Sequence, residues 1–149
     1  MKRSLKSARA QAGHAMIELA VSAAVMVTCI AGTFQFGYTF YVYNQLVTAV
    51  GNGGRYAAVC TYTPQEVDKR NQAIRNMVVY GDPQPAPDAR PVVTGLTPDL
   101  VDVNWVVESG APSAVSIAIR DFSIDAVFSK FTFHNRPGVE FPYVGRPEK

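Results

Sequence analysis

The chain has 149 residues, of which 48% are hydrophobic and 17% are charged. This length allows one modest domain with an additional element, and the composition is apolar for a soluble domain of this size. The formal net charge is +2, but four cations precede Gly13 with no acid among them, so the remainder carries about −2. A basic tail directly before an apolar run orients a membrane helix more often than it binds nucleic acid, so we expect a membrane partner and no nucleic acid.

The first predicted element is a membrane-spanning helix. The 22 residues from Ala15 to Phe36 contain one charge, Glu18. A helix needs about 20 residues to cross the hydrocarbon core, and this run is longer than the apolar core of a secretory signal. Aromatic residues are concentrated between 34 and 43, as expected where a spanning helix leaves the lipid. The basic tail predicts that it stays in the cytoplasm and that residues after about 40 lie outside.

The residues after the apolar run allow two interpretations. NQLVTAV (44–50) is compatible with a continuation of the helix, whereas GNGG (51–54) offers a break or a bend. Residues 55–59 either resume the helix or pack beside it. A single helix from about 14 to about 58 would be near 65 Å long, with its first half in lipid and its second half projecting into water.

A second, amphipathic helix is predicted over 63–81. Thr63 and Glu66 have the spacing of a capping box, Pro64 suits the first helical position, and Gly81 suits the C-terminal cap. Apolar residues recur at helical spacing, namely Val67, Ile74, Met77 and Val78. We expect this face to pack on the C-terminal sheet or on the first helix.

The remainder of the chain predicts a linker and a small sheet. Five prolines between 82 and 98 indicate an extended, linker-like segment. Alternating apolar residues over 101–107 and 115–120 predict a hairpin with one buried face, and 109–112 is a turn signal. Two further short strands are expected at Phe131–Phe133 and Val139–Phe141, around Arg136, Pro137 and Gly138.

The predicted fold class is therefore α+β, with a long N-terminal transmembrane helix, a second amphipathic helix and a small C-terminal antiparallel β-sheet. We expect three parts along the chain. These are a basic cytoplasmic leader over 1–13, a transmembrane and projecting helix over 14–58, and an extracytoplasmic α+β domain over 59–149.

Patterns of catalytic or metal-binding residues are sparse. The two histidines, His14 and His134, are far apart, and there is no zinc spacing, phosphate loop, nucleophile elbow or dinucleotide glycine pattern. Asp121 and Asp125 flank a predicted strand end and are interpreted as solvated surface, and His134 as a loop residue. Arg55 is interpreted as the water-facing end of the helix rather than an anion site. We therefore expect no enzyme activity, no cofactor, no metal and no small-molecule substrate.

The two cysteines are not expected to bridge each other. Cys29 lies in the apolar run, where it behaves as a small hydrophobe. Cys60 lies well beyond it, too far for a disulfide if the run spans a bilayer. Cys60 is either a free thiol or forms a disulfide with another chain, and the sequence leaves both alternatives open.

Glu18 requires an explanation, because an acid within a bilayer-length run is costly and is by default a functional candidate. It lies close enough to the start of the run to reach the cytoplasmic interface. Protonation, or pairing with Arg9 or with His14 one turn before it, would also lower the cost. A further explanation uses Gly13, which lies five residues before Glu18 and directly after the basic leader.

GHAMIE (13–18), between a basic leader and an apolar helix, resembles the type IV prepilin signal. The resemblance implies that a membrane peptidase cuts between Gly13 and His14 on the cytoplasmic side. His14 would then carry a free α-amino group, which Glu18 of a neighbouring helix would neutralise at low dielectric. Glu18 is thus the candidate helix-packing residue, and Gly13 with His14 the candidate cleavage site. In most type IV pilins the residue after the cut is aromatic, and His14 departs from that pattern.

A narrower resemblance, to the TadE-like family, extends over nearly the whole chain. It rests on GHAMIELA, FGYTFYVYNQLVTAVGNGGRYAAV, NMVVYG, GLTPDLVDV and FPYVGRP. These family members are pilin-like (pseudopilin) components of tight-adherence, or Flp type IVb, pili. The resemblance implies a single-pass inner-membrane protein with a periplasmic C-terminal domain, acting as a minor pilin or assembly factor, in the membrane or in the pilus at the cell surface. Its implied partners are prepilin peptidase, other pilins and the pilus assembly machinery.

Two alternatives remain open. One is an uncleaved, signal-anchored extracytoplasmic binding module that never enters a filament. The other is a membrane-tethered enzyme, which requires a cleft with convergent polar groups within 58–149.

Overall fold

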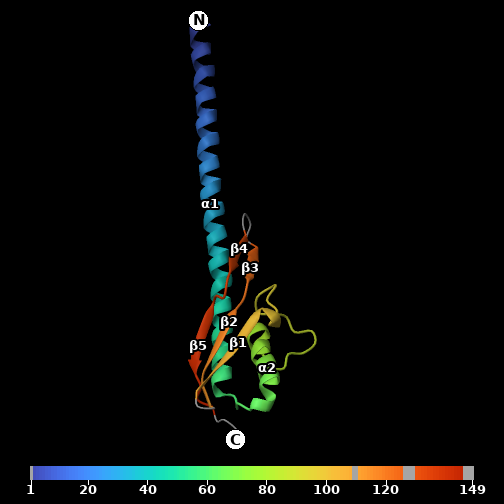
Figure 1. The fold of residues 1–149 in the computed structure, drawn as a ribbon. Coiled ribbons are helices and arrows are strands. Elements are labelled where there is room, and N and C mark those ends of the chain that lie inside the picture. Colours follow the sequence, from blue (N-terminus) through green and yellow to red (C-terminus); the bar gives the residue numbers. More distant parts are fainter. Residues whose placement is uncertain (1, 109–110, 126–129, 146–149) are drawn as a thin grey trace. The chain divides into compact units, whose positions relative to one another are not determined.

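The computed structural model describes the backbone of residues 2–108, 111–125 and 130–145, and the side chains within those ranges from Gly13 onward except at 111 and 125. The elements (Figure 1) are α1 (Lys2–Val59), the 3-10 turn η1 (Pro64–Glu66), α2 (Val67–Tyr80), the 3-10 turn η2 (Pro98–Leu100), β1 (Val101–Glu108), β2 (Ala111–Ile119), β3 (Phe122–Asp125), β4 (Lys130–Phe133) and β5 (Gly138–Pro142). The predicted α+β fold class is confirmed. Contacts divide the chain into two units, Met1–Tyr38 and Thr39–Lys149.

The GNGG segment (51–54) does not break the first helix, so of the two interpretations that the sequence allowed, the structure has the single continuous helix. α1 continues to Val59. A Cβ atom on Gly53 would fall on Cγ2 of Val78 in α2, and one on Gly54 would fall on the ring of Phe141 in β5. Glycine costs about 1 kcal/mol in a helix interior relative to alanine. Here that cost is offset because the missing side chains let α2 and β5 approach the helix backbone.

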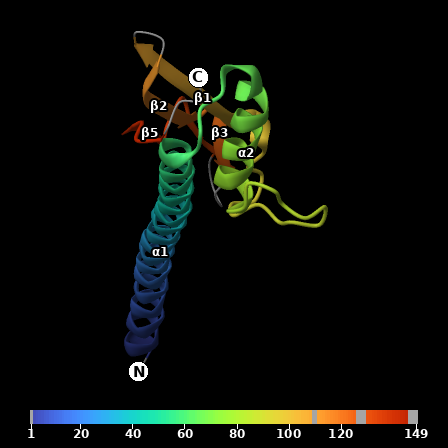
Figure 2. The same ribbon diagram turned by 90° about the horizontal axis from the view of Figure 1, so that it is seen from below.

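The second unit builds its core around the C-terminal part of α1. Leu46 and Val50, one turn apart, are fully buried, and Ala57 continues the stripe two turns later. Burial of one such aliphatic side chain stabilises a fold by about 1.5–3 kcal/mol. The same cluster includes Ile74, Val78 and Val79 of α2 and Val115, Ile117 and Ile119 of β2. Figure 2 shows α2 and the sheet beside this end of the helix.

α2 begins with a tighter turn than the sequence predicted. The N–H of Glu66 donates to the carbonyl of Thr63 at 3.0 Å, and neither η1 nor α2 has a side-chain N-terminal cap. The capping box predicted from Thr63 and Glu66 is therefore wrong, because a 3-10 turn starting at Pro64 already satisfies the backbone. Gly81 does form the predicted C-terminal cap, with φ 74° and an N–H donated to Met77.

The predicted hairpin is confirmed as β1 paired antiparallel with β2. β5 pairs with the other edge of β2, giving the strand order β1-β2-β5. Val101 lies opposite Ile119, and these two residues are fully buried. The pairing shifts register between Val106 and Val107, and Val107 is 48% exposed instead of continuing the buried face.

The predicted turn at 109–112 is too long, because Ala111 and Pro112 belong to β2 and Pro112 pairs with Val107. Residues 109 and 110 lie outside the described part of the chain. β4 and β5 match the two short strands predicted near the C-terminus. β3 was not predicted as a strand, and it pairs with β4 in a separate two-stranded sheet, called here the β3–β4 ribbon (Phe122–Asp125 and Lys130–Phe133).

The proline-rich segment 82–98 is more than a linker. Val93 and Leu96 are buried in the core of the second unit. The N–H of Val92 donates to the carbonyl of Val79 at 2.8 Å, which ties the segment to α2. It runs through turns, with the N–H of Leu96 donating to the carbonyl of Val93 at 3.1 Å, so the prediction of an extended linker is wrong.

Tyr143 ties the C-terminal end of the sheet to the end of α1. Its hydroxyl accepts the N–H of Tyr62 at 3.0 Å and donates to the carbonyl of Cys60 at 2.9 Å. Trp105 packs between the rings of Tyr62 and Tyr143, with centroid separations of 5.1 and 5.9 Å. These contacts hold the end of α1, the residues that follow it and the sheet together.

Replacing Gly53 with alanine should destabilise the second unit. Overpacking against Val78 costs about 1–3 kcal/mol, of which improved helix propensity returns about 1 kcal/mol. Gly51 is the matched control, because a Cβ there meets no atom within 4 Å. We expect Gly53→Ala to lower the Tm of the detergent-solubilised chain and Gly51→Ala to keep or raise it. Equal shifts for the two variants would contradict the close-packing explanation.

Candidate functional site

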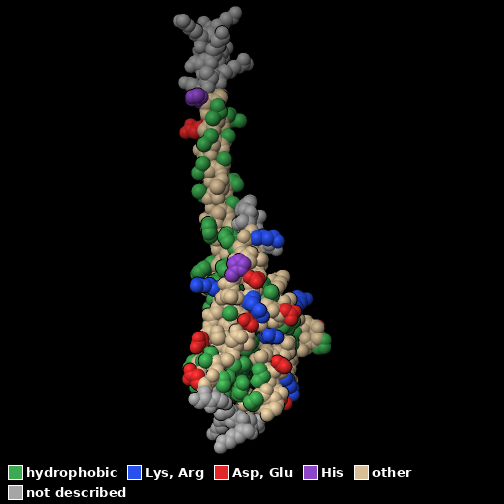
Figure 3. All heavy atoms as spheres, viewed as in Figure 1, with side chains coloured by type: hydrophobic (Ala, Val, Ile, Leu, Met, Phe, Trp, Pro, Cys, Tyr) green, Lys and Arg blue, Asp and Glu red, His purple; other side chains and the backbone are tan. Residues whose placement is uncertain are grey.

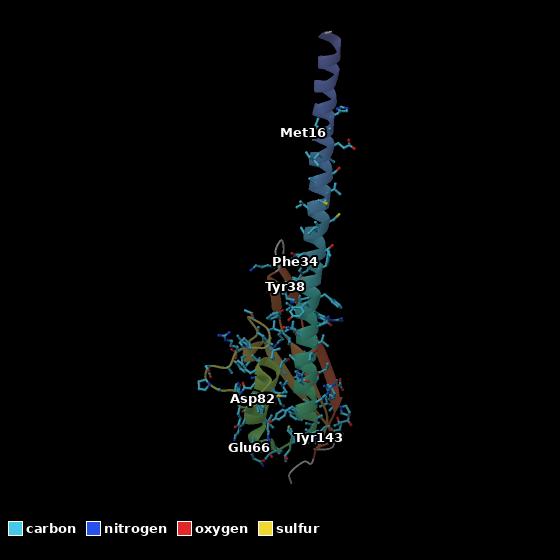
Figure 4. All side chains as sticks on the ribbon, turned by 180° about the vertical axis from the view of Figure 1, so that it is seen from behind. Met16, Phe34, Tyr38, Glu66, Asp82 and Tyr143 are labelled. Carbon is cyan, nitrogen blue, oxygen red and sulfur yellow. The ribbon has the colours of Figure 1, made fainter. Side chains whose placement is uncertain are left out.

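Between Met16 and Phe36, within the described part of the first unit, α1 presents a largely apolar surface. A candidate membrane span lies within Gly13–Val59, and the best window has a mean hydropathy of 2.0 with none of its residues buried. Large apolar side chains are each about 60–70% exposed, namely Met16, Ile17, Leu19, Val21, Val25, Met26, Val27, Ile30, Phe34 and Phe36. Figure 3 shows hydrophobic side chains along this part of α1, and Figure 4 shows Met16 and Phe34 standing out from it. The predicted long apolar helix is confirmed.

Polar side chains in this run are compatible with lipid. The hydroxyl of Thr28 donates to the carbonyl of Ala24 at 2.8 Å, and that of Thr33 donates to Cys29 at 2.9 Å. Each of these two hydroxyls is therefore satisfied by the helix itself.

The candidate cleavage and packing residues all lie on α1 and are all exposed. His14 and Glu18 are one turn apart, so they share a face of the helix. Gly13 lies about 140° around the helix from Glu18, and a Cβ on it meets no atom within 4 Å. The Arg9 side chain, a possible partner of Glu18, lies outside the described residues. His14 and Glu18 thus share one face of the helix, and both side chains are exposed.

Ionisable residues of the second unit form a surface pair rather than a catalytic site. Nδ1 of His134 lies 2.6 Å from Oδ1 of Asp121, and the two side chains are 77% and 70% exposed. His134 follows β4 in a loop, as predicted. The Asp125 side chain lies outside the described residues, and Arg55 is exposed on α1. At such exposure, water screens the interaction, so the pair contributes little to stability.

Two grooves lie in the second unit, and their linings contain one charged side chain between them. One, of about 280 Å³, lies between α1 and α2 and is lined by uncharged residues, including Asn44, Gln45, Asn52 and Met77. The other, of about 410 Å³, lies beside Tyr43 and contains one charged side chain, Arg136. In the described parts of the chain, no three His, Cys, Asp or Glu side chains come together as a metal site would require.

Both cysteines are free thiols, in agreement with the prediction of no disulfide between them. Sγ of Cys60 donates to the carbonyl of Ala57 at 3.2 Å. Burial raises the pKa of the Cys60 thiol above its ordinary value, while the positive charge of Arg70 partly opposes this change. The thiol is therefore protonated and poorly reactive at neutral pH.

Comparison with known proteins identifies the N-terminal part of the chain. The family model described as TadE-like protein matches residues 13–55, from the candidate cleavage glycine through the glycines that pack against α2 and β5. The TadE-like resemblance is thereby confirmed for this segment, and it supports a pilus-related, membrane-anchored protein. No curated protein and no solved structure matches the chain.

The raised pKa predicts slow alkylation of Cys60. In a Cys29→Ala background, iodoacetamide should modify Cys60 more slowly at neutral pH than a cysteine placed at the exposed Glu140, and the rate should rise at more alkaline pH. Because the folded thiol holds its proton more tightly than the unfolded one, this group's contribution to stability falls as pH rises past the unfolded pKa. Equal rates and equal pH profiles at the two sites would show that burial does not protect Cys60.

Proposed function

Because residues 13–55 are TadE-like, we propose that the chain is a minor pilin, pseudopilin or assembly component of a tight-adherence (Flp, type IVb) pilus. It is made with a basic cytoplasmic leader, and prepilin peptidase cuts it between Gly13 and His14. It then acts by packing its N-terminal helix with those of other pilins and by presenting the second unit outside the cytoplasm.

The observation that carries the proposal is one exposed carboxylate in an otherwise apolar surface. Glu18 lies on a helix of bilayer length whose large side chains all face outward, and the family match begins at Gly13. The first unit itself does not cover this apolar surface, and exposing it to water would be unfavourable. Lipid or neighbouring apolar helices would cover it, and a carboxylate in such low-dielectric surroundings needs a nearby cation.

Cleavage supplies that cation. The new α-amino group on His14 lies four residues, or about 6 Å along the axis, before Glu18. Within one chain, the amino group and the carboxylate are held at this fixed offset. Two neighbouring helices therefore pair these charges when one is shifted along the other by about 6 Å. At low dielectric the pair stabilises that register over others, because a shifted register leaves both charges without partners.

The second unit carries the specific part of the function. Its groove between α1 and α2 is lined by uncharged residues, which suits a contact with another protein. The proposed partners are the membrane, prepilin peptidase, other pilins and the assembly machinery. In this proposal the N-terminus is cytoplasmic and the second unit is periplasmic or, within a pilus, at the cell surface.

Processing is tested by the mass of the membrane-extracted chain from cells with an active prepilin peptidase. We expect the wild type to lack residues 1–13 and Gly13→Val to retain them, because a side chain at this position blocks a narrow protease site. Gly32→Val, the same change within the apolar run, should be processed normally.

An intact leader on the wild-type chain in those cells would contradict the proposal. It would favour the uncleaved, signal-anchored binding module instead. Normal processing of Gly13→Val would show that the cut lies elsewhere.

Replacing Glu18 with alanine should affect membrane insertion of the chain and assembly of the pilus in different ways. Insertion should be unchanged or improved, because a cost of about 2.5–3.5 kcal/mol for an acid at the helix centre, and less near its end, is removed. Pilus assembly, counted by electron microscopy, should fall because the neighbour's amino group loses its partner. Ser22→Ala, one turn further on the same face, is the control and should assemble normally. Wild-type piliation by Glu18→Ala at normal expression would remove Glu18 from the mechanism.

A further inference from the structure

The second unit contains a groove whose lining carries a single charge, on Arg136. The groove has a volume of about 410 Å³ and is lined by Tyr43 and Val47 of α1 and by residues 135–139, which link β4 to β5. It is called here the Arg136 groove. All of these residues belong to the second unit, and Figure 1 shows β5 beside α1. The volume falls within the range of sites that bind small molecules.

The backbone on both sides of Arg136 is held in place by the fold. Asn135 has a left-handed conformation with φ 52°, which asparagine adopts more readily than most residues. The carbonyl of Pro137 accepts the N–H of Ile119 at 3.1 Å, and the next residue begins β5. The base of the Arg136 side chain is therefore positioned beside the groove before any ligand arrives.

The opposite wall of the groove is formed by α1. Tyr43 and Val47 are one turn apart on this helix, and the ring of Tyr43 packs against Phe133 with centroids 5.3 Å apart. Val47 and Val139 make part of the lining apolar, whereas the rest of it includes a guanidinium group. A ligand in the groove thus meets charged hydrogen-bond donors and a hydrocarbon surface together.

The guanidinium group of Arg136 forms no hydrogen bond or ion pair with the described residues. Asp121 instead contacts His134 at 2.6 Å. Glu140 follows Val139, which lines the groove, so strand alternation places Glu140 on the other face of β5. Within the part of the chain that the structure describes, the charge of Arg136 is therefore not balanced by an ion pair.

The chemistry of this side chain indicates which anion would balance it. A guanidinium group presents parallel N–H donors that match the two oxygens of a carboxylate. Its single positive charge neutralises a monoanion, whereas a doubly charged phosphate would keep one negative charge beside Val47 and Val139. Leaving such a charge against an apolar surface is costly.

We propose that the Arg136 groove binds a small organic monocarboxylate. The carboxylate accepts hydrogen bonds from the guanidinium group, and the carbon body lies against Val47 and Val139. The inference concerns the second unit alone, so it is independent of cleavage at Gly13 and of the proposed role in a pilus.

The test is protection of Arg136 from phenylglyoxal, an arginine-selective reagent, in the full chain solubilised in a nonionic detergent. Peptide mass spectrometry measures the modification rate of each arginine separately. Benzoate at about 10 mM should slow the modification of Arg136 about fivefold or more, as expected for a Kd of about 2 mM or lower. Arg90 is exposed and lies outside the lining of the groove, so its rate should not change.

Two further probes test which chemical group is recognised. Benzamide has the same ring without the charge and should give little protection. Inorganic phosphate has the charge without the carbon body and should protect Arg136 less than benzoate does at the same concentration.

A carboxylate built into the groove should compete with the ligand. Val47→Glu places an acid in the lining, so benzoate should no longer slow the modification of Arg136. Val59→Glu makes the same change at an exposed position of α1 outside the lining, and benzoate should still protect. Trp105 emission, from the only tryptophan, checks that each variant is folded.

Equal modification rates of Arg136 with and without benzoate would overturn the proposal. Equal protection of Arg90 would do the same, because it would show general screening by the anion. Equal protection by benzamide would remove the role of the charge, and equal protection by phosphate would remove the preference for a carboxylate. Undiminished protection in folded Val47→Glu would place benzoate outside the groove.

Discussion

α1 has to satisfy two environments with one uninterrupted backbone. Between Met16 and Phe36 its large apolar side chains are exposed, as lipid requires. From Val42 onward a stripe of the same helix is buried against α2 and the sheet. Because α1 is continuous, the second unit begins in the chain directly after the apolar segment. The placement of the ribbon, the groove and the C-terminal strands within the second unit all follows from packing on this helix.

The glycines of α1 show how one residue type serves different purposes in one element. Gly53 and Gly54 are enclosed by Val78 and Phe141, so their missing side chains admit neighbouring elements. Gly13, Gly32, Gly37 and Gly51 have open space around the position of a Cβ. For Gly13 the explanation proposed here is recognition by a peptidase, an event that precedes assembly. The amino-acid composition cannot distinguish these two kinds of glycine, because they differ in which other residues pack against the helix at each position.

Glu18 is the only charged residue between Ala15 and Phe36. In the proposed function it pairs with the α-amino group that cleavage creates on His14 of a neighbouring chain. This pairing depends on a low local dielectric, since in bulk water the interaction would contribute little.

The candidate roles of Gly13, His14 and Glu18 come from the resemblance to the prepilin signal. The sequence by itself determined the apolar span, the second helix and the hairpin. These depend on local periodicity and spacing, which neighbours along the chain set directly. Only the tertiary structure decided that GNGG is helical, that Val93 and Leu96 enter the core, and that β3 pairs with β4. In each case contacts between distant residues outweigh local preference: glycine is tolerated where Val78 and Phe141 press against the helix, and a proline-rich segment becomes core because its apolar side chains meet α2.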